Sequence, residues 1–176
     1  MSSTLPPVRG CRLDEVLALR QAVLRPHQRL EELVFPGDDD PRAAHFCAED
    51  ALDGIISVAS VLPEAPQWEP SAAPAWRLRA MATVPKWRGR GVGASLLCTA
   101  IAHVRARGGG LFWCNARLGA VGFYEKAGLT TIGEPFEVPV IGPHIAMWAK
   151  LPTLAKSKNG ASKSTRTLRR LPRRPQ

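Results

Sequence analysis

A glycine-rich segment with two arginines carries the clearest chemical signal in the chain. The segment WRGRGVGASLL, residues 87–97, places glycines at alternate positions and continues into apolar residues with helical spacing. Glycines before a helix let a ligand approach bare backbone, and the free N–H groups of the first helical turn favour an anion such as phosphate. Arginines beside such amides add positive charge for the same ligand. The segment therefore predicts a phosphate-binding loop, and a tight turn without a ligand is the alternative.

Two common phosphate-binding loops fit this segment poorly. A Walker-type loop ends in Gly-Lys-Ser/Thr, whereas Gly93 is followed by Ala94 and Ser95, so no lysine can reach the phosphates. A dinucleotide-binding fingerprint, GxGxxA, can be written from Gly89. However, the next expected strand ends in Asn115, where an Asp or Glu should hold the ribose, and several strands precede the segment. The Walker-type loop is therefore excluded, and the dinucleotide fingerprint stays a disfavoured alternative.

The residues Arg88 to Gly93 match the pattern Arg or Gln, two residues, Gly, one residue, Gly or Ala. In this pattern the chain resembles the pyrophosphate loop of the GNAT acetyltransferases. On either side, MATVPKWRGRG resembles the family's fourth strand and loop, and NARLGAVGFYEKAGL is similar to the segment after its fifth strand. The likeness extends from Ile55 to Leu151 and is less specific over the first fifty residues. It implies an α+β GNAT fold, with a central, mixed and mostly antiparallel sheet flanked by helices on both faces.

The resemblance also implies that acetyl-CoA is the cosubstrate. Backbone groups at the end of the strand before the loop would pair with the pantetheine arm, and amides of the loop and helix start would bind the pyrophosphate. An asparagine after the next strand would contact the pantetheine or the adjacent backbone, although a strand-end cap is its alternative role. The implied acetyl-CoA-binding residues are Met81, Ala82, Thr83, Val84, Arg88, Gly89, Arg90, Gly91, Val92, Gly93, Ala94, Ser95 and Asn115. No metal is implied.

Tyr124 lies in GFYEKAGL at the position of the family's general acid, and it is the only tyrosine in the chain. The resemblance implies that an amine attacks the thioester directly, through a tetrahedral intermediate, so that the departing thiolate needs a proton. A phenol with an ordinary pKa of about 10 is protonated at neutral pH and can donate that proton. An aromatic packing residue is the alternative role of Tyr124.

A base for the acceptor amine is sought in the C-terminal region that would flank the substrate pocket, which contains Glu134, Glu137 and His144. A histidine can act as a base near neutral pH, but a hydrogen-bonded strand residue is equally compatible with the position of His144. Members of the family also use chains of water molecules instead of a side chain. The sequence therefore leaves both the base and the acceptor amine open.

Periodicity and turn signals predict the elements that must position these residues. The expected order is a helix from Arg12 to Leu24, strands over 44–49 and 55–62 joined at Asp53-Gly54, a strand over 76–84, a helix over 92–107, a strand over 111–115, a short helix over 117–127, and strands around Phe136 and over 145–151. These elements form an α+β domain with one strand-helix-strand crossover. The acidic segment FPGDDDP, residues 35–41, is interpreted as a solvated turn, with attraction of a cationic substrate as the alternative.

The net charge of +9 is concentrated at the C-terminal end. From Pro152 onward the chain has eight basic residues and no acid, which leaves sixteen basic against fifteen acidic residues in the body. The sequence therefore predicts a GNAT domain over residues 1–151 and a basic disordered tail over 152–176. The tail would bind nucleic acid, anionic lipid or an acidic partner, or would be a solvated extension without a partner.

The four cysteines include no CxxC pair and no metal-ligand spacing with a histidine, which predicts buried free thiols and no metal site. The N-terminus lacks the apolar core of a signal peptide, and no run is long enough to span a membrane, so a cytoplasmic protein is expected. The leading hypothesis is an N-acetyltransferase, as a monomer or homodimer. A noncatalytic acyl-CoA-binding module and a nucleic-acid-associated protein acting through the basic tail are the alternatives.

Overall fold

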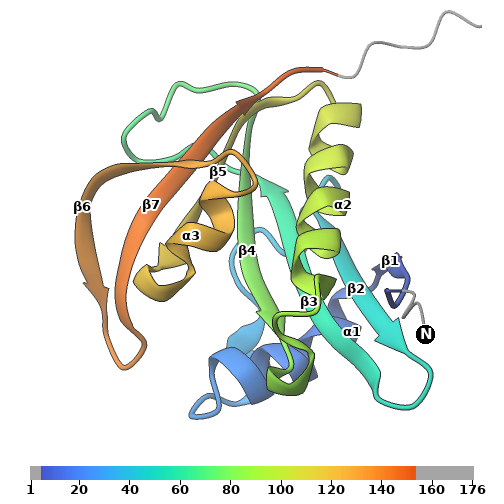
Figure 1. The fold of residues 1–176 in the computed structure, drawn as a ribbon. Helices are drawn as coiled ribbons and strands as arrows, with labels where there is room; N and C mark the ends of the chain where they lie inside the picture. Colours follow the sequence, from blue (N-terminus) through green and yellow to red (C-terminus); the bar gives the residue numbers. More distant parts are fainter. Residues whose placement is uncertain (1–4, 154–176) are drawn as a thin grey trace, which may run out of the picture.

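The computed structural model describes residues 5–153, which form one seven-stranded sheet flanked by helices (Figure 1). The strand order is β1-β2-β3-β4-β5-β7-β6. The strands are β1 (Val8–Cys11), β2 (Ala44–Asp50), β3 (Gly54–Pro63), β4 (Ala75–Thr83), β5 (Gly110–Arg117), β6 (Thr130–Val138) and β7 (Gly142–Leu151). The helices are α1 (Leu13–Leu19), α2 (Val92–Ala106) and α3 (Val121–Glu125), and the shorter helical turns are η1 (Arg20–Leu24), η2 (Leu30–Leu33), η3 (Pro85–Trp87) and η4 (Leu118–Ala120).

All neighbouring strands of this sheet are antiparallel except β4 and β5, which are parallel and are connected by α2. Parallel neighbours need such a crossover connection, so α2 forms the strand-helix-strand unit that the sequence predicts. The predicted α+β class and the mixed, mostly antiparallel sheet are confirmed. The sequence pattern does not predict β1, because a four-residue strand between prolines and a helix is too short to show a strand period.

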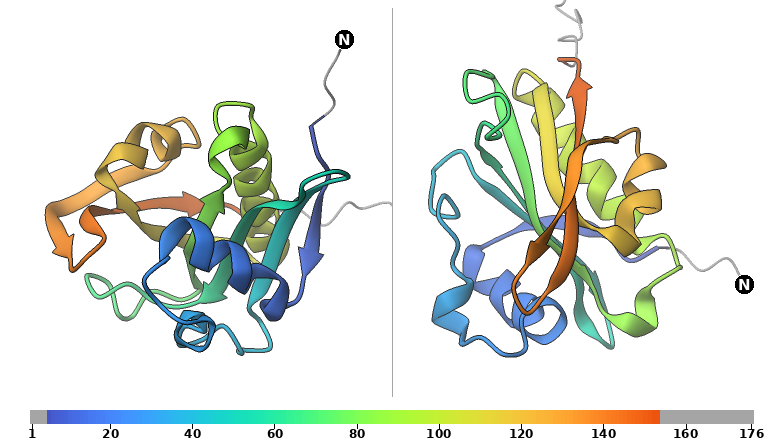
Figure 2. Two further views of the ribbon diagram at one scale, coloured as in Figure 1. Left: turned by 90° about the horizontal axis from the view of Figure 1, so that it is seen from below. Right: turned by 90° about the vertical axis from the view of Figure 1, so that its left-hand side faces the viewer.

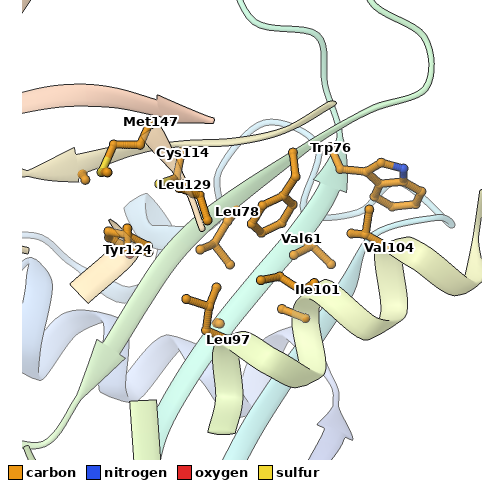
Figure 3. Packing of buried hydrophobic residues seen from close by; sticks show 14 of the residues in the cluster. Val61, Trp76, Leu78, Leu97, Ile101, Val104, Cys114, Tyr124, Leu129 and Met147 are labelled. Carbon is orange, nitrogen blue, oxygen red and sulfur yellow. The ribbon is translucent and has the colours of Figure 1, made fainter. Parts of the chain in front are cut away.

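The apolar side of α2 is buried against one face of the sheet. Leu97, Ile101 and Val104 belong to the same buried cluster as Val61 on β3 and Leu78 on β4 (Figure 3). Full burial of one such aliphatic side chain contributes about 1.5–3 kcal/mol relative to leaving it exposed. This packing fixes the start of α2 relative to the end of β4, where the glycine segment lies.

The opposite face of the sheet is covered by α1. Val16 and Leu19 of α1 form a second buried cluster with Cys47 on β2, Val58 on β3 and Ala82 on β4. Because side chains alternate along a strand, the same strands present one set of residues to α1 and another set to α2. Figure 2 shows α1 and α2 on opposite sides of the sheet, which confirms the expected helices on both faces.

The predicted helix from Arg12 to Leu24 is confirmed, but it is not uniform. The α-helical part ends at Leu19, and the turn from Arg20 to Leu24 is π-helical. The backbone N–H of Arg25 reaches the carbonyl oxygens of Arg20 at 3.1 Å and Gln21 at 3.2 Å. Such wide turns are rare and frequent at functional sites. Here the turn carries Arg20, whose side chain is fully buried.

The acidic segment after η2 is only partly the solvated turn that the sequence predicts. Asp38 is buried and forms an ion pair with Arg20, and the two oxygens of its carboxylate accept hydrogen bonds from both guanidinium nitrogens. Asp39 is exposed, and Asp40 pairs with Arg42 at the surface. The prediction is wrong for Asp38 because a buried arginine elsewhere in the chain requires a charged partner, which the local sequence does not reveal.

β7 ends at Leu151, the residue at which the sequence places the end of the domain. Most of the predicted basic tail, residues 154–176, lies outside the described residues, so its role stays a prediction. All four cysteines are free thiols, and Cys47 and Cys114 are buried as predicted. The prediction of burial is wrong for Cys11, which is half-buried, and for Cys98, which is exposed on α2. Among the helices of residues 5–153, none has the length and apolar character needed to cross a membrane.

Candidate active site

The separation of β4 from β5 is the central feature of the candidate site. The two strands pair at Ala75 with Leu111, Trp76 with Phe112 and Arg77 with Trp113, and within residues 5–153 the pairing ends there. β5 continues beside β7 as far as Arg117. Beyond Arg77, β4 therefore has an edge whose backbone groups face no neighbouring strand, although the strand lies in the middle of the sheet. An exposed edge of this kind can hydrogen-bond an extended ligand.

A bulge in β4 bends this free edge. The register between β3 and β4 shifts between Val58 and Ser60, and Ala80 on β4 has a φ of 52°. A non-glycine residue in the left-handed region is uncommon. Bulges bend a strand and redirect its side chains, and they are frequent next to active sites. The bulge therefore marks the part of β4 at which the sheet opens.

A cavity of about 1030 Å³ occupies this opening. We call it the central cavity. Three of its walls come from η1 with the residue after it, from the segment after η2, and from β4. The others come from the glycine segment, from the end of β5 with η4 and α3, and from β7 with the turn before it. A volume at the upper end of the range for small-molecule sites and an origin in many separate segments are both typical of a ligand site.

The glycine segment forms one end of the central cavity. Gly89 and Gly91 have φ angles of 72° and 85°, which a residue with a side chain adopts only at a cost. α2 begins at Val92, and the N–H of Ser95 donates to the Gly91 carbonyl at 3.0 Å. The amides of the first turn before Ser95 have no acceptor within the helix. The segment thus offers unpaired N–H groups and the positive end of a helix dipole to an anion.

Two exposed arginines add positive charge to this end. The Nε of Arg88 donates to the carbonyl of Thr83 at 3.1 Å, which ties the segment to the end of β4. The guanidinium of Arg90 lies over the ring of Trp87, 5.1 Å from its centroid. Trp87 is itself held by a hydrogen bond of 2.8 Å from Nε1 to the carboxylate of Asp53. Both guanidinium groups are therefore held in place by a carbonyl or an aromatic ring, and neither forms an ion pair with a carboxylate of the described residues.

The structure brings most of the predicted site residues together. Those that line the central cavity are Met81, Ala82, Thr83, Arg88, Gly89, Gly91, Gly93, Ala94, Asn115, Tyr124 and His144. Those that do not line it are Val84, Arg90, Val92, Ser95 and Glu134, together with Glu137. Val92 is a buried core residue, whereas Glu134 is exposed on the edge strand β6. The predicted residues that do not line the cavity therefore either support the loop and helix that form the site, or have no part in the site.

Tyr124 on α3 is buried below the opening between β4 and β5. Its ring packs edge-on against Phe123, and its hydroxyl contacts the sulfur of Met81 at 3.8 Å. Burial raises the pKa of the Tyr124 phenol far above its ordinary value, and the nearby Cys114 raises it further. The hydroxyl is therefore protonated at any physiological pH, and a thioether is only a weak acceptor for its proton.

His144 on β7 is the one predicted base that lines the central cavity. Its Nδ1 lies 2.8 Å from the carbonyl oxygen of Gly142, and its ring stacks on Phe136 at 6.2 Å between centroids. A carbonyl can only accept a hydrogen bond, so Nδ1 carries a proton. In the neutral imidazole the other nitrogen, Nε2, is then an acceptor. Glu134 and Glu137 do not line the central cavity.

The lining of the central cavity also contains residues that the sequence did not indicate, namely Arg25, Phe35, Pro36 and Arg117. Of these, only Arg117 could have been predicted from the sequence, because it follows Asn115 by two positions and so lies on the same face of β5. Arg25 and Phe35 come from irregular segments that carry no motif, and only the tertiary structure brings them to the site.

Arg77 and Arg79 on β4 also line the cavity and share one carboxylate, Glu64, at 2.6 Å and 3.1 Å. The guanidinium of Arg77 lies over the ring of Trp113, and Arg79 donates to the carbonyl of Pro36 at 2.8 Å. These two arginines are thus largely engaged within the protein. No aspartate or glutamate is among the described residues that line the cavity.

Comparisons with known proteins agree with these features. A family model for the acetyltransferase (GNAT) domain matches residues 41–130. An uncharacterized N-acetyltransferase of Bacillus subtilis strain 168, YitI, is 36% identical over 149 residues, which cover 83% of this chain and 97% of that protein.

Solved structures with the same fold are also found. ElaA of Escherichia coli has a TM-score of 0.67 at 17% identity, covering 83% of this chain and 100% of the other. An aminoglycoside 6'-N-acetyltransferase solved in complex with coenzyme A has a TM-score of 0.62 at 15% identity, covering 85% and 99%. At these identities the two structures show the fold alone.

Proposed function

Because the chain belongs to the GNAT family of N-acetyltransferases, we propose that it transfers the acetyl group of acetyl-CoA directly to an amine. Acetyl-CoA is the cosubstrate of the family and supplies the thioester. The observation that carries the proposal is the opening between β4 and β5, which ends at a glycine segment on the N-terminus of α2. A strand edge and an anion site in one cavity suit a ligand with an extended arm and a pyrophosphate.

The residues present fit such a ligand. The free edge of β4 from Met81 to Thr83 offers backbone groups to the pantetheine arm, and Asn115, exposed on β5, faces the same cavity. The amides at the start of α2 and the guanidinium of Arg88 would bind the pyrophosphate. A Cβ at Gly89 or Gly91 would strain the backbone in its left-handed conformation by about 1–2 kcal/mol, so glycine is favoured there.

In the proposed reaction, Tyr124 donates its phenolic proton to the departing sulfur as the tetrahedral intermediate collapses. Its raised pKa keeps the proton on the hydroxyl until the thiolate forms. The hydroxyl already contacts a sulfur atom, that of Met81 on the bulged strand, and this contact supports an orientation toward the opening.

For the base we propose His144 rather than Glu134. An alkylammonium acceptor must lose a proton before it can attack. His144 lines the cavity and, with Nδ1 bound to the Gly142 carbonyl, keeps Nε2 as an acceptor for that proton. Glu134 is exposed on β6 outside the cavity lining, so its carboxylate has no place in the step.

The test is CoA release from acetyl-CoA with a panel of amines, using Tyr124→Phe beside the wild type. We expect the variant to lose about 100-fold or more in kcat, because loss of a general acid costs about 10²–10⁴-fold. Acetyl-CoA affinity and thermal stability should be retained, since the ring that packs against Phe123 is unchanged.

Full turnover in Tyr124→Phe would contradict the role of the phenol. Tight binding of acetyl-CoA by the wild type without turnover of any amine would instead support a noncatalytic acyl-CoA-binding module. Absence of any acetyl-CoA binding would overturn the proposed function.

A further inference from the structure

One part of the lining of the central cavity carries two arginines and a histidine but no carboxylate. We call it the acceptor wall and define it by Arg25, Phe35, Pro36, Arg117 and His144, all of which line the cavity. Arg117 and His144 are directly opposed across β5 and β7. Directly opposed residues in an antiparallel pair lie on the same face of the sheet. A guanidinium and an imidazole therefore stand side by side on this face.

Arg25 approaches the same place from the end of η1. The Nη2 of Arg117 donates to the carbonyl of Leu24 at 3.3 Å, which brings its guanidinium next to the backbone that leads into Arg25. Burial lowers the pKa of Arg25, and the positive charge of Arg117 lowers it further. The two arginines are thus near neighbours of like charge, with Arg25 partly buried and Arg117 exposed.

No carboxylate within residues 5–153 forms an ion pair with Arg25 or Arg117. Two of the other cavity-lining arginines differ, because Arg77 and Arg79 share Glu64, whereas Arg88 beside the glycine segment also has no ion pair among the described residues. Like charges repel, and a partly buried guanidinium without a counterion loses solvation that nothing restores. An anion from a ligand would relieve both costs.

We propose that the acceptor amine carries a carboxylate and that Arg25 and Arg117 bind this carboxylate in the acceptor wall. The substrate class is then the amino carboxylates, that is, amino acids and related compounds. This inference rests on the proposed acetyl transfer. Arginine suits the task because its planar fork matches a carboxylate with two parallel hydrogen bonds.

The position of Arg117 agrees with this class of substrate. It lies two residues, about 7 Å along the strand, beyond Asn115, the residue proposed to contact the pantetheine arm. Binding of the carboxylate there holds the amine end of a small molecule toward the opening between β4 and β5. A polycationic acceptor would meet only positive charge, since no acidic side chain within the described residues lines the cavity.

The reaction balances with such a substrate. The acceptor enters as an ammonium and gives up one proton before attack, to His144 in the proposed mechanism. Its nitrogen forms the bond to the acetyl carbon, the carbon–sulfur bond breaks, and the nitrogen loses its second proton. One proton ends on the CoA sulfur and the other in solvent, so the products are an N-acetyl amino carboxylate and CoA.

The test measures acetyl transfer to matched pairs of amines that differ only in the charge of the carboxyl group. The pairs are phenylalanine against phenylalaninamide and β-alanine against β-alaninamide, with spermidine as a polycation. We expect the carboxylate member of at least one pair to have a kcat/KM about tenfold or more above its amide. Arg25→Met and Arg117→Met should each remove this preference by lowering turnover of the carboxylate alone.

The matched control is Arg107→Met, an exposed arginine at the end of α2 that does not line the cavity. It should leave the preference unchanged. Equal kcat/KM within both pairs, or preference for the amides or spermidine, would overturn the inference and leave the proposed function intact. The inference would also fail if Arg117→Met weakened acetyl-CoA binding, because the guanidinium would then serve the cosubstrate.

If the wild type binds acetyl-CoA but acetylates none of these amines, calorimetry in the presence of CoA measures binding of the product analogues instead. Binding of N-acetylphenylalanine but not of its amide would support the inference, and binding of both equally or of neither would overturn it. A wild type that does not bind acetyl-CoA would overturn the proposed function instead, so the two failures are distinguishable.

Discussion

The two ends of the central cavity are made of different parts of the polypeptide. The end proposed to bind acetyl-CoA, the donor half, is mainly backbone: the free edge of β4, two glycines with positive φ, and the first turn of α2. The acceptor wall is made of side chains from segments that are distant in sequence. Adding a side chain should therefore impair binding in the donor half, whereas removing a side chain should impair binding at the acceptor wall.

The acceptor wall depends on a buried network of side chains. Arg20 donates to the carbonyl of Leu33 at 2.8 Å and to the carboxylate of Asp38, which in turn accepts from the N–H of Phe35 at 2.9 Å. The guanidinium of Arg20 also lies 5.1 Å from the centre of the Phe35 ring. The segment that presents Phe35 to the cavity is therefore held by one ion pair rather than by a strand or helix.

The largest expected effect comes from breaking that ion pair. Asp38→Ala leaves the fully buried guanidinium of Arg20 without its partner, so the free energy of unfolding should fall by about 3–5 kcal/mol. Urea unfolding followed by circular dichroism measures this change. The matched control is Asp40→Ala, in the same acidic run but paired with Arg42 at the surface, and its effect should be much smaller.

Equal losses in Asp38→Ala and Asp40→Ala would contradict this account of the acceptor wall. A second check replaces both buried charges, as Arg20→Met with Asp38→Leu. Apolar replacements of similar size remove the uncompensated charge, so the double variant should recover much of the stability that Asp38→Ala loses.

The next effect concerns an addition to the donor half. Gly91→Glu places a side chain on a residue with a φ of 85° and a negative charge beside the proposed pyrophosphate site. Backbone strain alone corresponds to about 1–2 kcal/mol, so acetyl-CoA affinity should fall by at least about 30-fold once repulsion is added. Isothermal titration calorimetry with acetyl-CoA measures it.

Gly122→Glu is the control for that substitution. Gly122 lies on α3 outside the cavity lining, lacks a positive φ and has open space at its Cβ position. It should leave acetyl-CoA affinity unchanged. If both variants bind acetyl-CoA as the wild type does, the glycine segment is not the pyrophosphate site.

Removing a side chain from the donor half should have a smaller effect. Arg88→Ala keeps the backbone amides and loses one exposed charge, so acetyl-CoA affinity should fall by about two- to fivefold. At 1 M salt the difference from the wild type should nearly vanish, because the screening length is then about 3 Å. A loss as large as that of Gly91→Glu would contradict a site built mainly from backbone.

The smallest expected effect is on the alkaline side of the pH profile. Tyr124 acts as an acid only while protonated, and burial raises its pKa above the ordinary tyrosine value of about 10. Its protonated fraction therefore stays complete as pH rises from 8 to about 10, and kcat should not decline over that range. A titration of kcat near pH 9 that disappears in Tyr124→Phe would show that the phenol is less buried in solution.

Much of the fold could be predicted from local patterns. The Asp53-Gly54 turn, the helical spacing after Gly93 and the crossover from β4 through α2 to β5 are all confirmed. β1 could not be predicted because it is short and its stabilising contacts, such as the pairing with β2, are made with residues distant in sequence. The burial of Asp38 could not be predicted because its partner Arg20 is eighteen residues away, and Arg20 also donates to Ser60 on β3, forty residues from it.

The same division applies to the candidate site. The donor residues come from two continuous segments, so their spacing in sequence already indicates a phosphate loop and the strand before it. The acceptor residues Arg25, Phe35 and Arg117 are brought together only when α1, the segment after η2 and the end of β5 pack on one face of the sheet. No spacing of residues within one segment of the sequence predicts that these side chains lie close together.

By itself, the sequence determined the order of the strands and helices after β1 and the glycine segment, because backbone conformation and periodicity are set by neighbouring residues. The resemblance to the family singled out Tyr124. Only the tertiary structure decided where β4 leaves β5, which carboxylate neutralises Arg20, and that Arg25 and Arg117 share one wall without a carboxylate. Burial and long-range electrostatics depend on residues from the whole chain, so they become defined only when the sheet and its helices are assembled.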